Sequence, residues 1–307
     1  MLHKETTLQQ LEQAYKHAFY FNHFATKQGF LWKFVRLLFS VRFYGLYLLW
    51  RCGFLKKENR EFSLFWGRKI KADIIDQDII ILYVFGALIY SPAEYKLSKF
   101  FIKHLGSDDV FYDLGANYGF YTYLTSDMCR EVHSFEPIKE VCDVVKNNTA
   151  LNTHVTVSQV AVSNQSGEGE LFLSDSSGVS TINKKFADER TDVVNGSYKR
   201  SITISMITLS EYCQSHAIPT CMKMDVEGAE VFVLEGGEDI FRNNNILISL
   251  EVCRFDNGGD ASMQAVEKLR SFGYKSYAIT HEGELELVEG DLSRILDTAF
   301  DNFIFKK

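Results

Sequence analysis

The chain has 307 residues, of which 46% are hydrophobic and 24% are charged, so it is long and apolar enough to bury a full core. Residues 1–60 carry ten basic and three acidic side chains, which gives them a net charge of +7. Because the whole chain has a net charge of -7, residues 61–307 carry a net charge of -14. An acidic body argues against a general nucleic-acid-binding role, because polyphosphate would be repelled. The six cysteines form no C-x-x-C pair and are typical of reduced thiols in a cytoplasmic protein.

Residues 29–57 combine apolar, aromatic and basic side chains. The longest charge-free run in this segment, Phe43–Trp50, has eight residues, whereas a membrane-spanning helix needs about 20. The segment also lacks the position and the small-residue end of a secretory signal. Two interpretations stay open. Residues 1–60 either form a helical extension that packs on the protein or on a second subunit, or they contact the membrane interface through the aromatic and basic residues.

Residues 61–90 are predicted to form a small β-hairpin that leads into the main domain. Two short Ile-rich runs, Lys69–Ile75 and Asp78–Tyr83, are separated by a break and favour an antiparallel pair. The following S-P-A-E sequence is a capping box with proline at the first helical position, so a helix is predicted to begin there. This helix opens the third predicted region, residues 91–307.

From residue 110 onward, strand-like and helix-like segments alternate. The predicted strands lie near residues 110–114, 131–136, 154–162, 220–226, 246–252, 274–280 and 301–306. The predicted helices lie near residues 118–128, 138–149, 208–216, 228–242 and 260–272. Such alternation predicts a doubly wound, mostly parallel α/β sheet, with an antiparallel addition at one edge. A polar insertion at residues 167–200 interrupts the rhythm, and we expect it to shape a ligand pocket.

A loop with the sequence D-L-G-A-N-Y-G follows the first of these strands. Gly115 and Gly119 supply backbone freedom, and Asn117 tolerates left-handed conformations. The spacing differs from the G-x-G-x-x-G of a dinucleotide site, and the Asp113 carboxylate would repel a pyrophosphate but suit an ammonium group. Glu136 ends the next strand, where an acid holds ribose hydroxyls. A ligand with a ribose, an amine and no pyrophosphate points to S-adenosylmethionine.

More acidic residues close the later strands. Asp225 and Glu227 lie in the run K-M-D-V-E-G-A-E, and Glu251 closes the strand after it. Asp225 projects at a strand end where packing alone would favour an apolar residue. Asp113, Glu136, Asp225 and Glu251 all lie at the carboxyl ends of predicted parallel strands. This pattern predicts a cleft for a cationic ligand or a metal.

These motifs, with N-N-T-A-L-N and A-V-S-N between them, resemble the FkbM-type methyltransferase family over roughly residues 90–280. That family belongs to the class I, Rossmann-like methyltransferases that use S-adenosylmethionine. The resemblance implies a seven-stranded sheet with an antiparallel edge hairpin. It also implies an enzyme that transfers a methyl group to a hydroxyl of a sugar, glycan or polyketide-like natural product.

The resemblance also implies roles for individual residues. Those that would contact the cofactor are Asp113, Gly115, Asn117 and Gly119 at the methionine end, Glu136 at the ribose, and Ala161 and Val162 at the adenine. Asp225 is the leading candidate to orient or deprotonate the acceptor hydroxyl, with Glu227 and Glu251 assisting. These carboxylates could also hold Mg²⁺, but strand-end acids in this fold can serve without a metal, and we expect none.

Two other functions stay open at this point. A nicotinamide-dependent oxidoreductase on a Rossmann-like fold is one, although G-x-G-x-x-G is absent. A non-catalytic, membrane-tethered scaffold is the other, although Asp113, Glu136 and Asp225 are intact. We expect a hydroxyl-bearing acceptor and no nucleic acid as partner, and the sequence indicates no oligomeric state. The expected location is the cytoplasm, with peripheral contact to the inner face of the membrane if residues 29–57 bind lipid.

Overall fold

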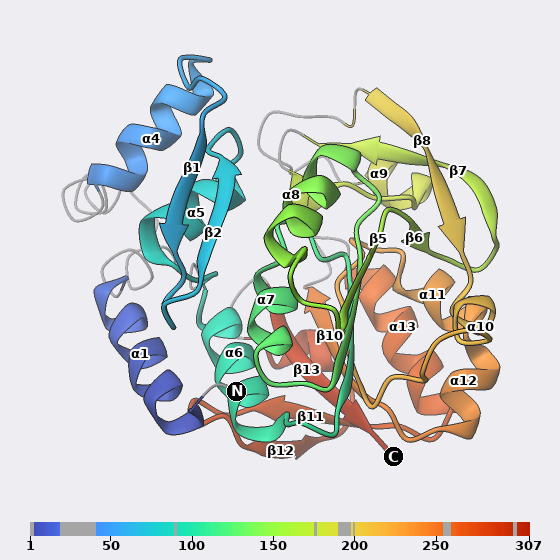
Figure 1. Cartoon of the computed structure of the whole chain (residues 1–307). Helices are drawn as coiled ribbons and strands as arrows, with labels where there is room; N and C mark the ends of the chain where they lie inside the picture. The colour runs from blue at the N-terminus through green and yellow to red at the C-terminus, as the bar shows by residue number, and fades with distance from the viewer. Residues whose placement is uncertain are drawn as a thin grey trace. The chain divides into compact units, whose positions relative to one another are not determined.

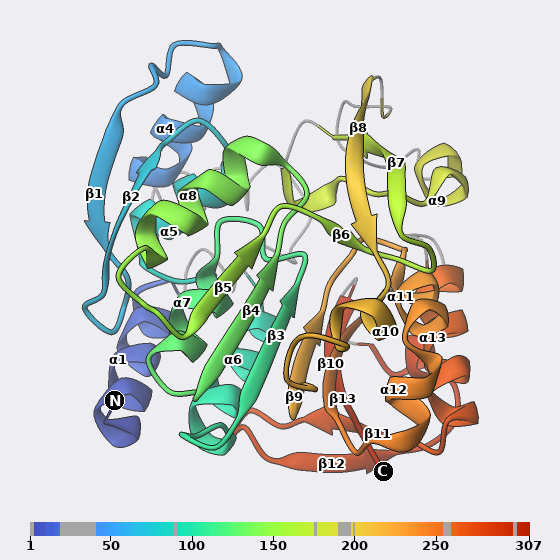
Figure 2. The ribbon, with the colours of Figure 1, turned by 45° about the vertical axis from the view of Figure 1, so that its right-hand side comes forward.

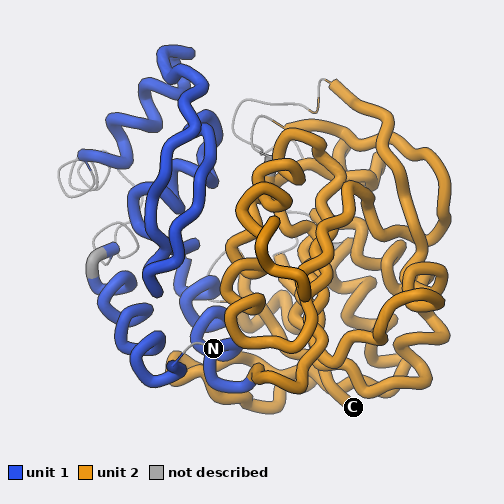
Figure 3. The backbone as a smooth tube through the Cα atoms, in the orientation of Figure 1, with its two compact units in different colours: residues 1–104 blue, residues 105–307 orange. Residues whose placement is uncertain are grey.

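Figure 1 shows a computed structural model of the whole chain. The structure describes residues 3–18, 41–88, 91–174, 177–189, 198, 200–253, 259–296 and 300–307. The chain divides into two compact units, Met1–His104 and Leu105–Lys307, coloured separately in Figure 3. The boundary follows the helix that was predicted to begin the main domain, so that helix belongs to the first unit.

The first unit is mainly helical and contains one β-hairpin. Its elements are α1 (Lys4–His17), α4 (Val41–Arg51), β1 (Asn59–Ser63), β2 (Lys69–Asp73), α5 (Gln77–Phe85) and α6 (Pro92–His104). The predicted start of α6 is confirmed, because the Ser91 hydroxyl accepts a hydrogen bond from the Glu94 N–H at 3.3 Å. The part of the aromatic, basic segment at residues 29–40 lies outside the described residues.

The hairpin of this unit differs from its prediction. β2 pairs with β1, which was not predicted, and the run Asp78–Tyr83 lies within helix α5. The Asp76 side chain caps this helix by accepting the Asp78 N–H, and Gly86 ends it in a left-handed conformation. A short run of apolar residues that is buried on several sides carries no periodicity, so its sequence cannot separate a strand from a helix.

The second unit is built on a mixed sheet of eight strands. The first half of this unit comprises β3 (Val110–Leu114), α7 (Phe120–Ser126), β4 (Glu131–Phe135), α8 (Lys139–Thr149), β5 (Val155–Ser158), β6 (Ala161–Val162), β7 (Gly167–Leu173), η1 (Ser177–Val179), α9 (Lys184–Glu189) and β8 (Arg200–Ile207). The second half comprises α10 (Leu209–Tyr212), β9 (Cys221–Met224), α11 (Glu230–Gly236), α12 (Glu238–Asn243), β10 (Leu247–Cys253), α13 (Gly259–Ser271), β11 (Lys275–Ile279), β12 (Leu285–Val288), η3 (Leu292–Arg294) and β13 (Phe300–Lys306).

The strand order is β12-β11-β13-β10-β9-β3-β4-β5, and Figure 2 shows β5, β4 and β3 side by side. Strands β5, β4, β3, β9 and β10 are parallel to one another, whereas β13 is antiparallel to both β10 and β11. The predicted α/β sheet with an antiparallel edge is therefore confirmed. It has one strand more than the seven expected, because β12 also pairs with β11.

Alternation along the strands separates an apolar face of the sheet from a partly polar one. Tyr112 and Leu114 of β3 belong to the main core, which also contains residues of α10, α11, α12 and α13. Asp113 points to the opposite face, where the Thr122 hydroxyl of α7 donates a hydrogen bond to it. In the sheet register Asp113 lies between Ser134 of β4 and Lys223 of β9. Polar side chains therefore meet in the middle of the sheet.

A second sheet, of order β6-β8-β7, was not predicted. The strand expected over residues 154–162 is divided between β5 and β6, and β8 was missed altogether. The alternation in S-I-T-I-S-M-I, with Ile204 and Met206 buried, is the signal that could have revealed β8. The helix expected over residues 228–242 is two helices, α11 and α12, separated at Gly237.

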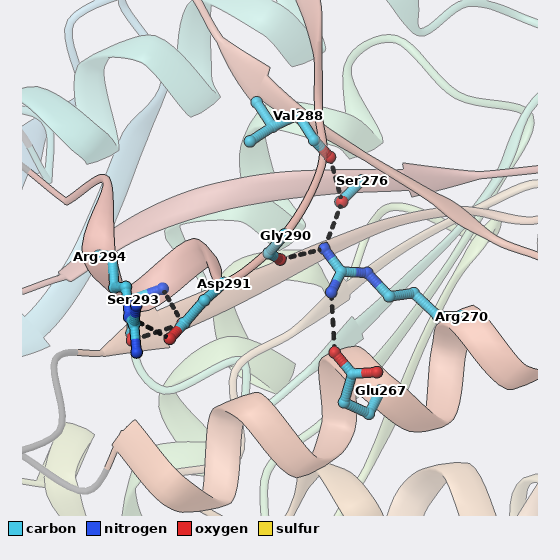
Figure 4. A network of polar contacts seen from close by, with 8 residues as sticks. All are labelled: Glu267, Arg270, Ser276, Val288, Gly290, Asp291, Ser293 and Arg294. Carbon is cyan, nitrogen blue, oxygen red and sulfur yellow. Dashed lines mark hydrogen bonds and ion pairs between the residues drawn. The ribbon is translucent and has the colours of Figure 1, made fainter.

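The antiparallel edge is tied to helix α13 through one arginine (Figure 4). The Arg270 guanidinium donates to the Gly290 carbonyl at 2.7 Å, to the Ser276 hydroxyl at 3.1 Å and to Glu267 at 2.7 Å. The Ser276 hydroxyl in turn donates to the Val288 carbonyl at 2.7 Å. Arg270 therefore links the β11–β12 hairpin to the helix that precedes it.

Candidate active site

A cleft lies at the carboxyl ends of the central strands β3, β4 and β9. Its volume is about 560 Å³, including the part open to solvent. The residues that line it are Gly115, Asn117, Phe135, Glu136, Pro137, Ile138, Val160, Ala161, Val162, Leu171, Gly178, Ser180, Ile182, Asp225, Val226 and Glu227. Ligands of open α/β sheets bind at this end of the strands. The cleft therefore has the position of a small-molecule site.

The glycine loop forms one wall of the cleft and requires glycine at its first position. Gly115 has φ 75°, and a β-carbon there would lie 1.9 Å from the Asp225 carbonyl oxygen. The loops after β3 and β9 thus meet backbone to backbone, which only glycine allows. Asn117, with φ 47°, and Gly119, with φ 81°, are also left-handed. Gly115 and Asn117 line the cleft, whereas Gly119 is not among its lining residues.

Glu136 is a buried carboxylate in the wall of the cleft. One of its oxygens accepts the Asn117 N–H at 3.0 Å, and the other accepts the Ile138 N–H at 2.8 Å. Burial raises the pKa of Glu136 to about 7, although these two backbone hydrogen bonds act in the opposite direction. Each carboxylate oxygen can accept a further hydrogen bond. Glu136 therefore holds the glycine loop in place and keeps acceptor capacity for a ligand.

Asp113 lies beneath the glycine loop and is not a lining residue of the cleft. Its Oδ2 accepts the Thr122 hydroxyl at 2.7 Å, whereas its Oδ1 is buried and has no hydrogen-bond partner within the described part of the chain. Burial raises the pKa of Asp113, and the nearby Lys223 ammonium opposes this shift. The charge expected to face Asp113 is thus supplied, within the protein, by a lysine.

Lys223 and Asp225 form an ion pair at the end of β9. The Lys223 Nζ lies 2.7 Å from the Asp225 Oδ2, and the lysine side chain is 7% exposed against 30% for the aspartate. The same ammonium lies 5.2 Å from the centre of the Tyr121 ring. Lys223 therefore fixes the side chain of Asp225 at the cleft. We did not predict Lys223 as a site residue, although K-M-D places it on the same side of the strand as Asp225.

The loop after β9 is held by a buried glutamate. Glu230 Oε1 accepts the Gly228 N–H at 3.2 Å and the Val226 N–H at 3.4 Å. Burial raises the pKa of Glu230 to about 7. Glu227 lines the cleft and is left-handed, with φ 52°, which is uncommon for a residue other than glycine. Such strain is found most often at functional sites.

Glu251 lies on β10 and does not line the cleft. It accepts a hydrogen bond from the Cys253 thiol at 3.5 Å. Burial raises the pKa of Cys253, and the charges of Glu251, Glu227 and Glu230 raise it further, so these carboxylates lie within electrostatic range of one thiol. Among the residues that the structure describes, no group of three or more acids, histidines or cysteines could hold a metal ion.

The polar insertion contributes a further wall of the cleft. Leu171, Ser180 and Ile182 are lining residues from this segment. Asn183 Nδ2 donates to the Gly228 carbonyl at 2.6 Å, which joins the insertion to the loop after β9. With Ile138 and the residues of β6, Leu171 and Ile182 of the insertion give the cleft an apolar part of its lining. A ligand that carries both polar and apolar groups would match this lining.

The sequence was then compared with known proteins. The methyltransferase FkbM domain matches residues 113–276, just over half of the chain. The chain belongs to the FkbM methyltransferase family. The matched region contains every residue that lines the cleft. The comparison with curated protein sequences gave no match.

Several solved structures are similar to this chain, and three of them are described as methyltransferases. Methyltransferase FkbM from Methylobacillus flagellatus has 14% identity and a TM-score of 0.45, over 75% of this chain and 54% of the other, so this chain spans about half its length. Precorrin-6y C5,15-methyltransferase from Geobacter metallireducens has 13% identity and a TM-score of 0.39, over 70% and 87%. A methyltransferase from Streptococcus mutans, in complex with SAH, has 11% identity and a TM-score of 0.38, over 69% and 96%.

No helix in the described parts of the chain is long and apolar enough to cross a membrane.

Two histidines on or near strands of the main sheet are held inside the fold. His133 contacts the Tyr212 hydroxyl at 2.8 Å and Glu131 at 2.7 Å, and His154 contacts the Ser126 carbonyl at 2.8 Å. These hydrogen bonds hold both imidazoles within the fold.

Proposed function

We propose that this methyltransferase uses S-adenosylmethionine and methylates a hydroxyl group of a sugar, glycan or polyketide-like natural product. The observation that carries the proposal is Glu136, a buried carboxylate with free acceptor capacity in the cleft wall. It lies between a glycine loop on one side and the apolar residues Ala161 and Val162 on the other. A ribose bound by Glu136 would direct its base toward the apolar end and its charged end toward Asp225.

The residues of the cleft fit this cofactor. S-adenosylmethionine supplies a methyl group on a positively charged sulfur, together with an ammonium group. Asp225 and Glu227 line the end of the cleft that would receive these charges, and the Oδ1 of the nearby Asp113 has no hydrogen-bond partner among the described residues. A pyrophosphate would instead meet three carboxylates in the cleft, which argues against a nicotinamide dinucleotide.

Asp225 is the residue best placed to act on the acceptor. Its side chain is partly exposed in the cleft, and the ion pair with Lys223 limits its rotation. It would accept the proton that the hydroxyl loses as its oxygen becomes methylated. Glu227 lines the same end of the cleft and would assist by hydrogen bonding to further hydroxyl groups. Glu251 could act only through neighbouring residues, because it is not among the lining residues.

Ligand binding tests the cofactor. Isothermal titration of the full chain with S-adenosylmethionine should give saturable binding, and titration with NAD should give none. Glu136→Gln should weaken the binding of S-adenosylmethionine by about tenfold or more, since one acceptor becomes a donor. The exposed Glu140 of α8 offers a matched control, and Glu140→Gln should bind as the wild type does. Equal binding by both variants would remove the basis of the proposal.

Methyl transfer tests the acceptor. The purified protein, supplied with S-adenosylmethionine labelled on its methyl group, is incubated with a lysate of the source cells, and the labelled product is isolated. We expect an acid-stable methyl ether on a glycan or a small molecule. Asp225→Asn should lower the rate of labelling more than it lowers cofactor affinity. A labelled protein or nucleic acid would contradict the acceptor class while leaving the cofactor assignment in place.

A further inference from the structure

Within the part of the first unit that the structure describes, helix α4 packs against α5 through one face. Phe43 is its one buried residue, and the Phe43 ring lies 6.0 Å from that of Tyr47 and 6.1 Å from that of Phe85 on α5. The Arg42 guanidinium lies over the ring of Tyr83, also on α5. These contacts fix the orientation of α4 on its neighbour and determine which side chains remain outside.

The opposite face of α4 is apolar and exposed. Val41, Leu48 and Leu49 are between 45% and 62% exposed, and their helical spacing places them on one side. Apart from Phe54, which follows this helix, the other large exposed apolar residues among those described belong to the second unit and are dispersed along it: Leu151, Ile202, Ile218, Leu287 and Ile295. Single exposed apolar residues are ordinary, whereas a contiguous group marks an interaction site.

An ordered turn extends this face beyond the end of the helix. Gly53 is left-handed, with φ 71°, and the Phe54 N–H donates to the Leu49 carbonyl at 2.8 Å. This is the hydrogen-bond pattern of a glycine-capped helix end, so the backbone at Phe54 is fixed by the helix. The Phe54 side chain is nevertheless 73% exposed. We call Val41, Leu48, Leu49 and Phe54 together the α4 face.

The residues next to the α4 face are basic. Arg51, Lys56 and Lys57 are all exposed. Glu58, the acidic residue that follows these lysines, forms an ion pair with Arg60 at 2.6 Å. An apolar surface bordered by positive charge matches a bilayer with anionic headgroups, because lipid tails can receive the apolar side chains while phosphates face the lysines.

We propose that the α4 face is a docking site for an anionic membrane surface, on which the helix lies in the interface. An eleven-residue helix is about 16 Å long, too short to cross a hydrocarbon layer of about 30 Å. A second copy of the chain, joined through its own α4 face, is a poorer occupant, because the exposed basic residues beside the two faces would then repel one another. The inference goes beyond methyl transfer and does not depend on it.

Vesicle co-sedimentation of the full chain tests the inference. The probes are phosphatidylcholine vesicles that contain phosphatidylglycerol and vesicles of phosphatidylcholine alone. We expect binding to the anionic vesicles and a loss of about tenfold or more in the double variant Leu48→Ser/Phe54→Ser. The variant Lys56→Glu/Lys57→Glu changes only exposed residues outside the helix, so it should fold normally and also lose binding. Leu287→Ser is the matched control, because Leu287 is 51% exposed on β12, and it should bind as the wild type does.

Three results would overturn the inference. They are no binding of the wild type to anionic vesicles, equal binding by the wild type and Leu48→Ser/Phe54→Ser, and a wild-type dimer in solution that this variant converts to a monomer. The last result would assign the α4 face to a second copy of the chain. Binding of S-adenosylmethionine should be the same in the wild type and in both double variants. The inference and the proposed function can therefore fail separately.

Discussion

At the scale of single residues, the cleft depends on positions where one side chain, or its absence, decides the geometry. Gly115 allows two loop backbones to come into contact. Glu136 accepts hydrogen bonds from the glycine loop and from Ile138, the residue that precedes α8. Lys223 places a positive charge between two carboxylates that the sequence separates by more than a hundred residues. Each of these positions can be altered by itself.

Gly115→Ala should destabilise the protein strongly. The new β-carbon would lie 1.9 Å from the Asp225 carbonyl oxygen, and the left-handed conformation itself disfavours alanine by about 1–2 kcal/mol. We expect a loss of at least about 2 kcal/mol in the free energy of unfolding, measured with urea. Gly106→Ala is the control, because no atom lies within 4 Å of a β-carbon there and its backbone is not left-handed. Similar stability of the two variants would contradict the close approach of the loops.

Glu136 should make the stability of the unliganded protein depend on pH. Its pKa is raised from the ordinary 4.5 to about 7, so the folded state binds its proton more tightly than the unfolded state does. The free energy of unfolding of the wild type, relative to Glu136→Gln, should therefore fall as the pH rises from about 5 to 8. The fall should be about 1–3 kcal/mol, because one pKa unit corresponds to about 1.4 kcal/mol.

Urea unfolding at several pH values measures this difference. The comparison with Glu136→Gln removes the contributions of other buried groups, such as Glu230 and His133, which are present in both proteins. The exposed Glu140→Gln should show the same pH dependence as the wild type. A wild-type stability that rises relative to Glu136→Gln would show that Glu136 is ionised more easily in the folded state.

At the scale of elements, the sheet is parallel where it bears the cleft and antiparallel at the edge beyond β10. The parallel strands direct their carboxyl ends to one side, which gathers the loops after β3, β4 and β9 around the same space. The small sheet of β6, β8 and β7 then places the insertion beside these loops. The antiparallel edge contributes no lining residue to the cleft and has a structural role.

Arg270→Ala should loosen this edge. The guanidinium donates to a carbonyl, a hydroxyl and a carboxylate and is 25% exposed, so its removal should lower the free energy of unfolding by about 1–3 kcal/mol. Hydrogen exchange should become faster in β11 and β12. Arg294→Ala is the control, because Arg294 is 83% exposed in its ion pair with Asp291, and the change should be below about 1 kcal/mol. Equal effects would mean that Arg270 does not link the hairpin to α13.

At the scale of the whole molecule, the cleft and the α4 face belong to different units of the chain. All residues that line the cleft lie in the second unit, whereas the α4 face lies in the first. The basic excess of residues 1–60 also lies within the first unit. Substitutions in the cleft should therefore leave the proposed membrane contact unchanged, and substitutions in the α4 face should leave the cleft unchanged.

Cofactor binding should stabilise the whole fold. A ligand present at 100 times its dissociation constant adds about 2.7 kcal/mol to the free energy of unfolding when only the folded state binds it. S-adenosylmethionine should have this effect, and the gain should be larger at pH 8 than at pH 6, because Glu136 is then ionised and accepts stronger hydrogen bonds from the ribose hydroxyls. Urea unfolding with and without ligand measures it. Stabilisation by NAD in place of S-adenosylmethionine would favour the oxidoreductase.

The sequence by itself was sufficient for the features that depend on neighbours along the chain. Alternating strands and helices predicted the parallel sheet, and the glycine spacing and strand-end acids placed Gly115, Asn117, Glu136 and Asp225, all of which line one cleft. Local patterns report periodicity, capping and turn geometry, which are properties of consecutive residues. The family followed from the same motifs.

Only the tertiary structure decided which of these side chains meet. It placed Asp113 beneath the loop beside Lys223, left Glu251 outside the cleft, turned Asp78–Tyr83 into a helix and paired β8 with β7. Each result depends on strand order, register and burial, which bring together residues far apart in the sequence. A strand's own sequence fixes which residues share a face, but the neighbour across the sheet comes from another part of the chain.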